Sequence, residues 1–270
     1  TQTLCEHSRR GQFQPVGLEL SFGPDGAIPA ATFTLQDGSE MLLSGRIDRV
    51  DAVERDGVVY LRVIDYKSGR VTINLSDIYH SLKLQLLTYL DVAMTHAQNQ
   101  LGREVVPGAI LYFCIDDPII KTKGEVPAED EIEKKLLQEM RMTGMVLADQ
   151  AVIKMMDRQF GPDSDLLPVK IKKDGNFTAH SAVLTREQFE LLRSHLKTQL
   201  ISAGNDIIDG VVDIAPVRQG STRSCRYCPF KPVCQFDILI EGNTYRNITT
   251  AERDTIWRKL AQEFEEGGNV

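Results

Sequence analysis

The stretch that decides the fold runs from Leu43 to Gly69 and reads LSGRIDRVDAVERDGVVYLRVIDYKSG. Apolar and polar residues alternate on both sides of a polar turn, Glu54-Arg-Asp-Gly57. Leu43, Gly45 and Ile47 lie at every second position before the turn, as do Val59, Leu61 and Val63 after it. Because a period of two around a glycine-containing turn is typical of paired strands, we expect a β-hairpin here.

Two carboxylates and a lysine lie on the arms of this hairpin. Asp48 and Asp65 occupy comparable points on the two arms, and Lys67 leaves its strand on the same side as Asp65. Carboxylate oxygens suit Mg²⁺ and Mn²⁺, and such a metal can polarise a phosphodiester and lower the pKa of a bound water. The lysine can orient that water or offset charge on phosphorus. The alternative is a hairpin with solvated acidic residues.

Composition is that of an ordinary globular protein. The 270 residues are 42% hydrophobic and 26% charged, and the net charge of −7 argues against a chain that coats nucleic acid by bulk electrostatics. No apolar run reaches 18 residues, and the start of the chain has no signal-peptide pattern, which favours an intracellular location. Since Thr1 is not an initiator methionine, we expect the chain to be part of a longer protein.

The remaining pattern indicates an α/β arrangement, in which helices pack against a mixed sheet. Asp37-Gly38 is a hairpin turn, and Thr185 and Gln188 form a capping box. We expect further strands over residues 12–22, 31–35, 41–49, 105–115 and 211–214. We expect helices over residues 78–98, 128–142, 185–203 and 249–265.

The helix that follows the hairpin carries Gln85 and Tyr89, which are four residues apart and therefore share one face. Because this helix comes directly after the strand with Asp65 and Lys67, that face can look back at the metal site. The alternative is a surface glutamine and a half-buried tyrosine without a role in chemistry.

Three motifs in this order resemble the RecB-type branch of the PD-(D/E)XK nuclease superfamily: Gly-x-Ile-Asp48, Ile-Asp65-Tyr-Lys67-Ser-Gly and Gln85-Leu-x-x-Tyr89. The resemblance implies a restriction-endonuclease-like core. It makes Asp48 and Asp65 ligands of Mg²⁺ or Mn²⁺ and Lys67 the catalytic lysine, with Gln85 and Tyr89 supporting the active centre and the DNA.

In that family an upstream helix usually contributes a further histidine or glutamate ligand. No clear equivalent is visible in the sequence. Glu19 is a candidate on a strand, and His7 is a poorer one.

Three of the five cysteines form a cluster, Cys225-x₂-Cys228-x₅-Cys234. Intracellular cysteines at this spacing are more often metal ligands than disulfides, and three thiolates need a fourth ligand for zinc or an iron–sulfur cluster. Within the chain the fourth ligand would be Cys5 or Cys114, although Cys114 lies in an apolar strand and is better interpreted as a core thiol.

The resemblance implies a [4Fe–4S] cluster on Cys225, Cys228 and Cys234, with a distant cysteine outside this chain as the fourth ligand and Cys5 incidental. Such a cluster would tie the end of the chain to the core. A zinc knuckle or unliganded thiols remain the alternative. We therefore expect a nuclease core over residues 1–220, with the cysteine cluster and a final helix over 221–270 packed on it.

The resemblance further implies a subunit of a bacterial ATP-dependent helicase–nuclease that processes double-strand DNA ends for recombinational repair. It would cut the 5′-terminated strand, as single strands leave the unwound duplex, beside an AddA-type partner subunit in the cytoplasm at the nucleoid. No phosphate-binding loop occurs in the chain, so ATP hydrolysis belongs elsewhere. Basic residues near the site would guide the DNA: Arg46, Arg49, Arg70 and Lys83.

Two other functions fit parts of the pattern. One is an inactive nuclease fold that serves as a DNA-binding or scaffolding module. The other is an interaction domain that is stabilised by zinc and whose acidic residues are ordinary solvated surface residues.

Overall fold

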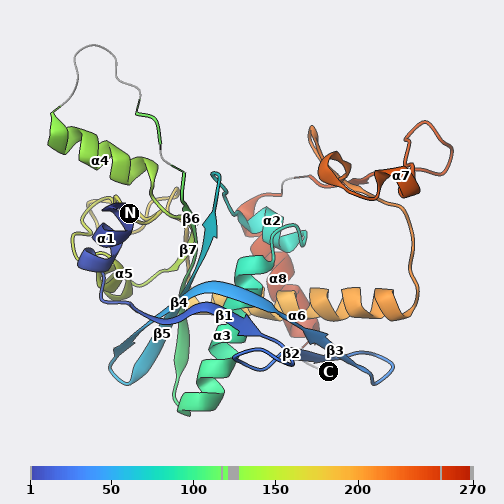
Figure 1. Cartoon of the computed structure of the whole chain (residues 1–270), viewed down its shortest axis with the longest axis horizontal. Coiled ribbons are helices and arrows are strands. Elements are labelled where there is room, and N and C mark those ends of the chain that lie inside the picture. The colour runs from blue at the N-terminus through green and yellow to red at the C-terminus, as the bar shows by residue number, and fades with distance from the viewer. Residues whose placement is uncertain (1, 117, 121–127, 250, 268–270) are drawn as a thin grey trace.

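The computed structural model describes residues 2–116, 118–120, 128–249 and 251–267, and its centre is one mixed sheet. Six strands lie in the order β1-β4-β5-β6-β7-β8 (Figure 1). Their bounds are Gln14–Phe22 for β1, Gly45–Arg55 for β4, Val58–Lys67 for β5, Val105–Cys114 for β6, Thr143–Leu147 for β7 and Val183–Leu184 for β8. The predicted α/β class with a mixed sheet is confirmed.

Helices cover both faces of this sheet (Figure 1). The bounds of the helices in the described residues, whether or not they cover the sheet, are Gln2–Arg10 for α1, Leu75–Tyr79 for α2, Gln85–Leu101 for α3, Glu129–Glu139 for α4, Gln150–Met156 for α5, Arg186–Ile208 for α6, Lys231–Cys234 for α7 and Arg253–Gly267 for α8. Helix α3 packs on β5 and β6, and α6 packs on α3 and α8. The opposite face is covered by α1 and α5. The chain just after α1 is held to α5 by a hydrogen bond from Gln12 N–H to the Met155 carbonyl at 2.6 Å.

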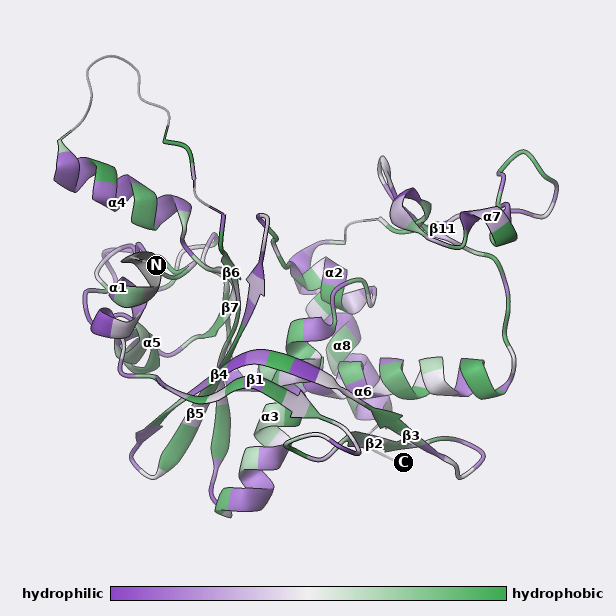
Figure 2. Ribbon diagram, in the orientation of Figure 1, coloured by the Kyte–Doolittle hydropathy of each residue, from purple (hydrophilic) through white to green (hydrophobic). Residues whose placement is uncertain are grey.

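The predicted hairpin forms from β4 and β5, which pair antiparallel. Arg49 lies opposite Ile64, so Asp48 and Asp65 are neighbours across the two strands. Strand β5 then runs parallel to β6, which is buried along nearly its whole length. Figure 2 shows hydrophobic residues concentrated in these inner strands, whereas hydrophilic and hydrophobic residues alternate along α4.

A buried ion group on the α1 face fixes the hairpin. Asp51 is fully buried on β4, and its Oδ2 accepts from Arg62 Nε at 2.8 Å and pairs with Arg62 Nη2 at 2.7 Å. Its Oδ1 accepts from Arg49 Nε at 2.6 Å, and the Arg62 guanidinium lies over the Phe13 ring at 5.0 Å. A slip of one residue would move Asp51 to the other face and leave a buried arginine without its partner.

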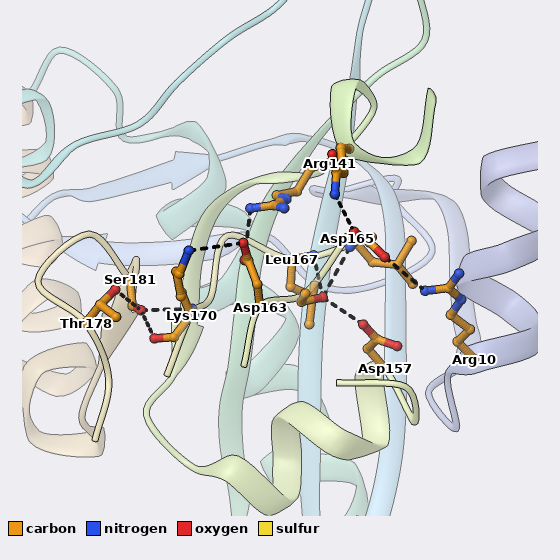
Figure 3. Close-up of polar contacts among 12 residues, drawn as sticks. Arg10, Arg141, Asp157, Asp163, Asp165, Leu167, Lys170, Thr178 and Ser181 are labelled. Atoms are coloured by element: carbon orange, nitrogen blue, oxygen red, sulfur yellow. Dashed lines mark hydrogen bonds and ion pairs between the residues drawn. The ribbon is translucent and has the colours of Figure 1, made fainter. Parts of the chain in front are cut away.

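A polar network holds together the segment between Asp157 and Ser181 (Figure 3). Ser164 donates to the Asp157 carboxylate at 2.7 Å and accepts from the backbone N–H groups of Leu166 and Leu167. Asp165 Oδ2 lies 3.9 Å from Arg10 Nη1, which links the segment to α1.

Beyond α6 the chain leaves the sheet (Figure 1). Residues 210–249 contain a small sheet and few buried side chains. Its strands lie in the order β10 (Thr222–Arg223), β9 (Val217–Gln219) and β11 (Arg246–Asn247). The remaining elements are β2 at Ala31–Thr34, β3 at Glu40–Leu43 and the 3₁₀ helix η1 at Ser224–Tyr227. Helix α8 then returns and buries Ile256 and Leu260 in the core. The predicted boundary near residue 220 stays a prediction.

Several predicted elements were wrong in detail. The helix expected over 78–98 is split between α2 and α3, because Ser81 takes a left-handed conformation (φ 59°). The stretch 41–49 is likewise divided between β3 and β4 at Ser44. Residues 211–214 are not a strand; they pair with no neighbouring strand in the described structure, and Val212 is 86% exposed. The capping box of Thr185 and Gln188 is present as predicted, with both hydrogen bonds.

Replacing Asp51 by alanine should lower the free energy of unfolding by about 3–5 kcal/mol, because the change leaves Arg62 buried without its counter-ion. Urea denaturation followed by circular dichroism measures the loss. Glu54→Ala is the matched control, since its ion pair with Arg103 is exposed and should be worth under about 1 kcal/mol. Equal losses in the two variants would contradict a structural role for the buried group.

Candidate active site

The five predicted site residues lie together at the end of β5. Asp65 Oδ2 is 2.6 Å from Lys67 Nζ, and Lys67 Nζ donates to Gln85 Oε1 at 3.0 Å. Gln85 Nε2 in turn donates to the Tyr89 hydroxyl at 3.0 Å. Asp48 Oδ2 accepts from the backbone N–H of Tyr66 at 2.8 Å. An ion pair and hydrogen bonds therefore connect the polar side chains of the hairpin to those of helix α3.

Local structure explains this placement. Side chains alternate along β5, so Asp65 and Lys67 face α3 while Arg62 and Tyr66 face α1. Helix α3 begins at Gln85, and its buried Leu86 and Leu87 hold the first turn against the core. Gln85, the first residue of α3, therefore points to the end of β5.

Burial shapes the electrostatics of the site. Desolvation raises the pKa of Asp65, while the hydrogen bond and charge of Lys67 lower it and the charge of Asp48 raises it. Burial, with the charges of Asp65 and Tyr89, raises the pKa of Tyr112 to about 12. Tyr112 therefore stays neutral, and its ring lies 5.5 Å from Lys67 Nζ.

A cleft of about 180 Å³ opens beside Lys67. Tyr112 and Cys114 of β6 form one wall, and Arg141 and Thr143 line the side next to β7. Tyr112 was missed from sequence because the apolar run 105–115 indicated only a buried strand. Its pairing with Asp65 across β5 and β6 is what brings it to the site.

The donor set fits a hard divalent cation. Asp48 uses one oxygen for a backbone N–H, and Asp65 uses one for Lys67, so each carboxylate keeps an oxygen for a metal. Mg²⁺ is usually held by one or two carboxylates and completes its shell with waters and phosphate oxygens. Within the described ranges, no three His, Cys, Asp or Glu side chains lie close enough together to bind one metal ion. Asp48 and Asp65 therefore have no third such side chain grouped with them among these residues.

The two upstream ligand candidates differ in position. Glu19 lies on β1 opposite Asp48, since Leu18 pairs with Arg49 and Leu20 with Ile47, and it contacts Arg46 at 3.0 Å. His7 is buried on the other face, with its ring 6.0 Å from that of Phe113.

Burial and three nearby arginines lower the pKa of His7 to about 3. The sheet separates this neutral imidazole from Asp48 and Asp65, so only Glu19 lies on their face of the sheet.

The basic residues that were predicted to guide the DNA form ion pairs with carboxylates of this chain. Arg46 pairs with Glu19, Arg70 with Glu139 at 3.4 Å, and Lys83 with Asp77 at 2.9 Å. The expectation for Arg49 was wrong, because its guanidinium turns to the opposite face and binds Asp51. Strand alternation decides this orientation.

The cysteine motif lies in the segment that leaves the sheet. Cys225 is in η1, Cys228 follows it, and Cys234 ends α7, and all three thiols are partly exposed. The described residues do not gather these thiols into a group that could bind a metal ion. Cys5 is exposed on α1, and Cys114 is partly exposed at the cleft beside Lys67. The predicted cluster stays a prediction.

Comparison with known proteins identifies the family. Residues 1–235 match the model of the PD-(D/E)XK nuclease superfamily. The chain belongs to this superfamily. The resemblance seen in the three motifs is thereby confirmed at the level of the superfamily.

The chain is also similar to longer bacterial proteins, each named as the B subunit of an ATP-dependent helicase/deoxyribonuclease. It is 59% identical over 264 residues to the protein of Pelotomaculum thermopropionicum, covering 98% of this chain and 23% of that protein. The protein of Desulforamulus reducens is 46% identical over 260 residues, covering 96% of the chain and 22% of that protein. This chain therefore spans less than a quarter of the length of the relatives it matches.

No helix of the described structure is long and apolar enough to cross a membrane.

Replacing Lys67 by methionine should raise the pKa of Asp65 further, because the ammonium group that lowers it is removed while burial remains. NMR titration of the Asp65 side-chain carboxyl carbon measures this change. Lys172→Met, in an exposed turn remote from the site, serves as the control and should leave the titration unchanged. An unaltered Asp65 titration in Lys67→Met would contradict the contact.

Proposed function

We propose that this chain is a metal-dependent deoxyribonuclease domain that hydrolyses phosphodiester bonds. The observation that carries the proposal is the arrangement of Lys67, which contacts both Asp65 and Gln85 beside the neighbouring carboxylate of Asp48. Membership of the PD-(D/E)XK superfamily supports the same chemistry.

Each residue has a distinct role in this proposal. Asp48 and Asp65 would hold Mg²⁺ or Mn²⁺, which when bound polarises the phosphate and lowers the pKa of a water. Lys67 Nζ remains directed at the same point because it donates a hydrogen bond to Gln85 Oε1. Its positive charge offsets the charge that develops on the phosphate. Tyr89 fixes the Gln85 amide by accepting from its Nε2. Lys67 and Gln85 therefore form a pre-organised pair before DNA binds.

We further propose that the domain belongs to an AddB-type subunit that acts with an AddA-type partner. The identity to proteins named as B subunits of a helicase/deoxyribonuclease supports this assignment. In such an assembly the domain would cut the 5′-terminated single strand of an unwound duplex, in the cytoplasm at the nucleoid, during repair of double-strand ends.

An inactive DNA-binding scaffold is the second candidate. It is favoured by one observation: the described residues gather two carboxylates and no third ligand at the site. Metal dependence separates the two functions, because a scaffold binds DNA equally well with or without Mg²⁺.

The direct test is cleavage of labelled single-stranded DNA with Mg²⁺ or with EDTA. Asp65→Asn and Lys67→Ala should each lower the rate by at least about 10²-fold, since they remove a metal ligand and the group that offsets phosphate charge. Asp56→Asn, in the exposed hairpin turn, should cut like the unaltered chain. Persistent cutting by Asp65→Asn or Lys67→Ala would refute the assigned site.

We also propose that Cys225, Cys228 and Cys234 ligate a structural [4Fe–4S] cluster, on the support of their spacing. Because the fourth ligand is expected outside this chain, the test uses a full-length B subunit that contains the chain. Purified without oxygen, it should be brown and contain iron, and Cys225→Ser should lose both the colour and the iron. Cys5→Ser should keep them. Protein that contains zinc, or no metal, would contradict the iron–sulfur assignment.

A further inference from the structure

An open cavity of about 650 Å³ lies where α2, α6, α8 and β11 meet. It begins next to the candidate active site. Leu84 lines the cavity, and the following residue, Gln85, accepts the hydrogen bond from Lys67 Nζ. None of the sequence motifs accounts for this cavity.

Three basic side chains from separate elements line the cavity: His80 after α2, Arg246 on β11 and Lys259 on α8. Burial lowers the pKa of His80, and the charges of Lys259 and Arg246 lower it further. A hydrogen bond with the Thr249 backbone and the charge of Asp77 act in the opposite direction. Because exposed charges are screened beyond about 10 Å, both cations lie near the imidazole of His80.

Arg246 and Lys259 are both exposed, and neither forms an ion pair with a carboxylate of the described residues. Lys259 Nζ lies 5.6 Å from the centre of the Tyr79 ring, which attracts a cation but does not neutralise it. By contrast, the basic residues that were predicted to guide the DNA are paired with carboxylates. Two positive charges of the cavity are therefore left for an anion from outside the chain.

Two carboxylates also line the cavity, Asp206 and Glu263. Glu263 Oε2 is 2.8 Å from His195 Nδ1, so this carboxylate is already held by a buried histidine. Asp206 is exposed near the end of α6. Since neither forms an ion pair with Arg246 or Lys259, an external anion does not have to displace a carboxylate from these two cations.

The position of the cavity selects the kind of anion. Guanidinium and ammonium groups bind phosphate oxygens through charge-assisted hydrogen bonds. A DNA strand held at Lys67 and continuing past Gln85 reaches the cavity at Leu84. The phosphates of that strand are therefore the anions that the nuclease chemistry would bring to Arg246 and Lys259.

We propose that Arg246 and Lys259 bind a backbone phosphate of the DNA strand whose scissile phosphodiester lies at Asp65 and Lys67, with His80 beside the bound phosphate. This inference rests on the proposed nuclease function and adds a second contact for the same strand. The contact is made to the backbone, so it reads no base. Because Arg246 belongs to the segment 210–249, which also carries the three clustered cysteines, that segment takes part in holding the DNA.

Binding of a fluorescently labelled single strand tests the proposal by anisotropy, in EDTA so that no cutting occurs. The double variant Arg246→Gln/Lys259→Gln should bind about tenfold more weakly at low salt, as expected for the loss of one charge-assisted contact. The slope of log affinity against log salt concentration should also become shallower by about 0.7, the value for one phosphate of a single strand.

Lys172→Gln/Lys173→Gln is the matched control, because it removes the same two charges from an exposed turn remote from the cavity. It should keep the affinity and the salt slope of the unaltered chain.

NMR titration of the His80 ring locates the contact. Saturation with the same oligonucleotide should raise the pKa of His80, because a phosphate beside the ring stabilises the imidazolium. Arg246→Gln/Lys259→Gln should not show this rise on addition of DNA. Inorganic phosphate at the same total phosphate concentration should have much less effect than the strand.

Equal weakening in the two double variants would overturn the proposal, as would a His80 titration that bound DNA leaves unchanged. A rise produced equally by inorganic phosphate would overturn the assignment to a DNA strand. A chain that cuts DNA with Mg²⁺ but binds it independently of Arg246 and Lys259 would keep the nuclease function and lose this contact. Conversely, a chain that binds through these residues and does not cut would refute the proposed catalysis and support the contact.

Discussion

The interaction on which the site depends is the buried ion group of Asp51 and Arg62 between β4 and β5. A buried charge pair adds little net stability compared with apolar packing, but a mispaired buried arginine is strongly unfavourable. The group therefore fixes register more than it adds free energy. In that register Asp48 lies beside Asp65, and both face α3, so a structural pair on one face of the hairpin positions the carboxylates on the other.

The remainder of the sheet supports this hairpin. Strand β6 runs parallel to β5 and brings Tyr112 level with Asp65. Strand β7 approaches β6 closely at Gly144, where φ is +145° and a Cβ atom would lie 2.1 Å from the Ile110 carbonyl oxygen. Glycine at that position lets β7 close the wall of the cleft beside Lys67.

The hairpin, and the fact that Asp48, Asp65, Lys67, Gln85 and Tyr89 lie together, could be predicted from sequence because the signals are local: strict alternation, a glycine turn and fixed spacing. Other features depend on tertiary contacts. The break between α2 and α3 rests on Ser81, whose left-handed conformation leaves no periodic signal. Helix α1 is short and has few apolar residues, and ion pairs of Arg10 with Glu6 and Asp165 help to hold it.

The central claim is that the hairpin register creates a two-carboxylate metal site next to Lys67. Crystals of this chain soaked in Mn²⁺, studied by anomalous diffraction, test it most directly. The account predicts a manganese peak coordinated by oxygens of both Asp48 and Asp65, on the face that carries Lys67 and Gln85. A peak that touches neither carboxylate, or one on the His7 face of the sheet, would contradict it.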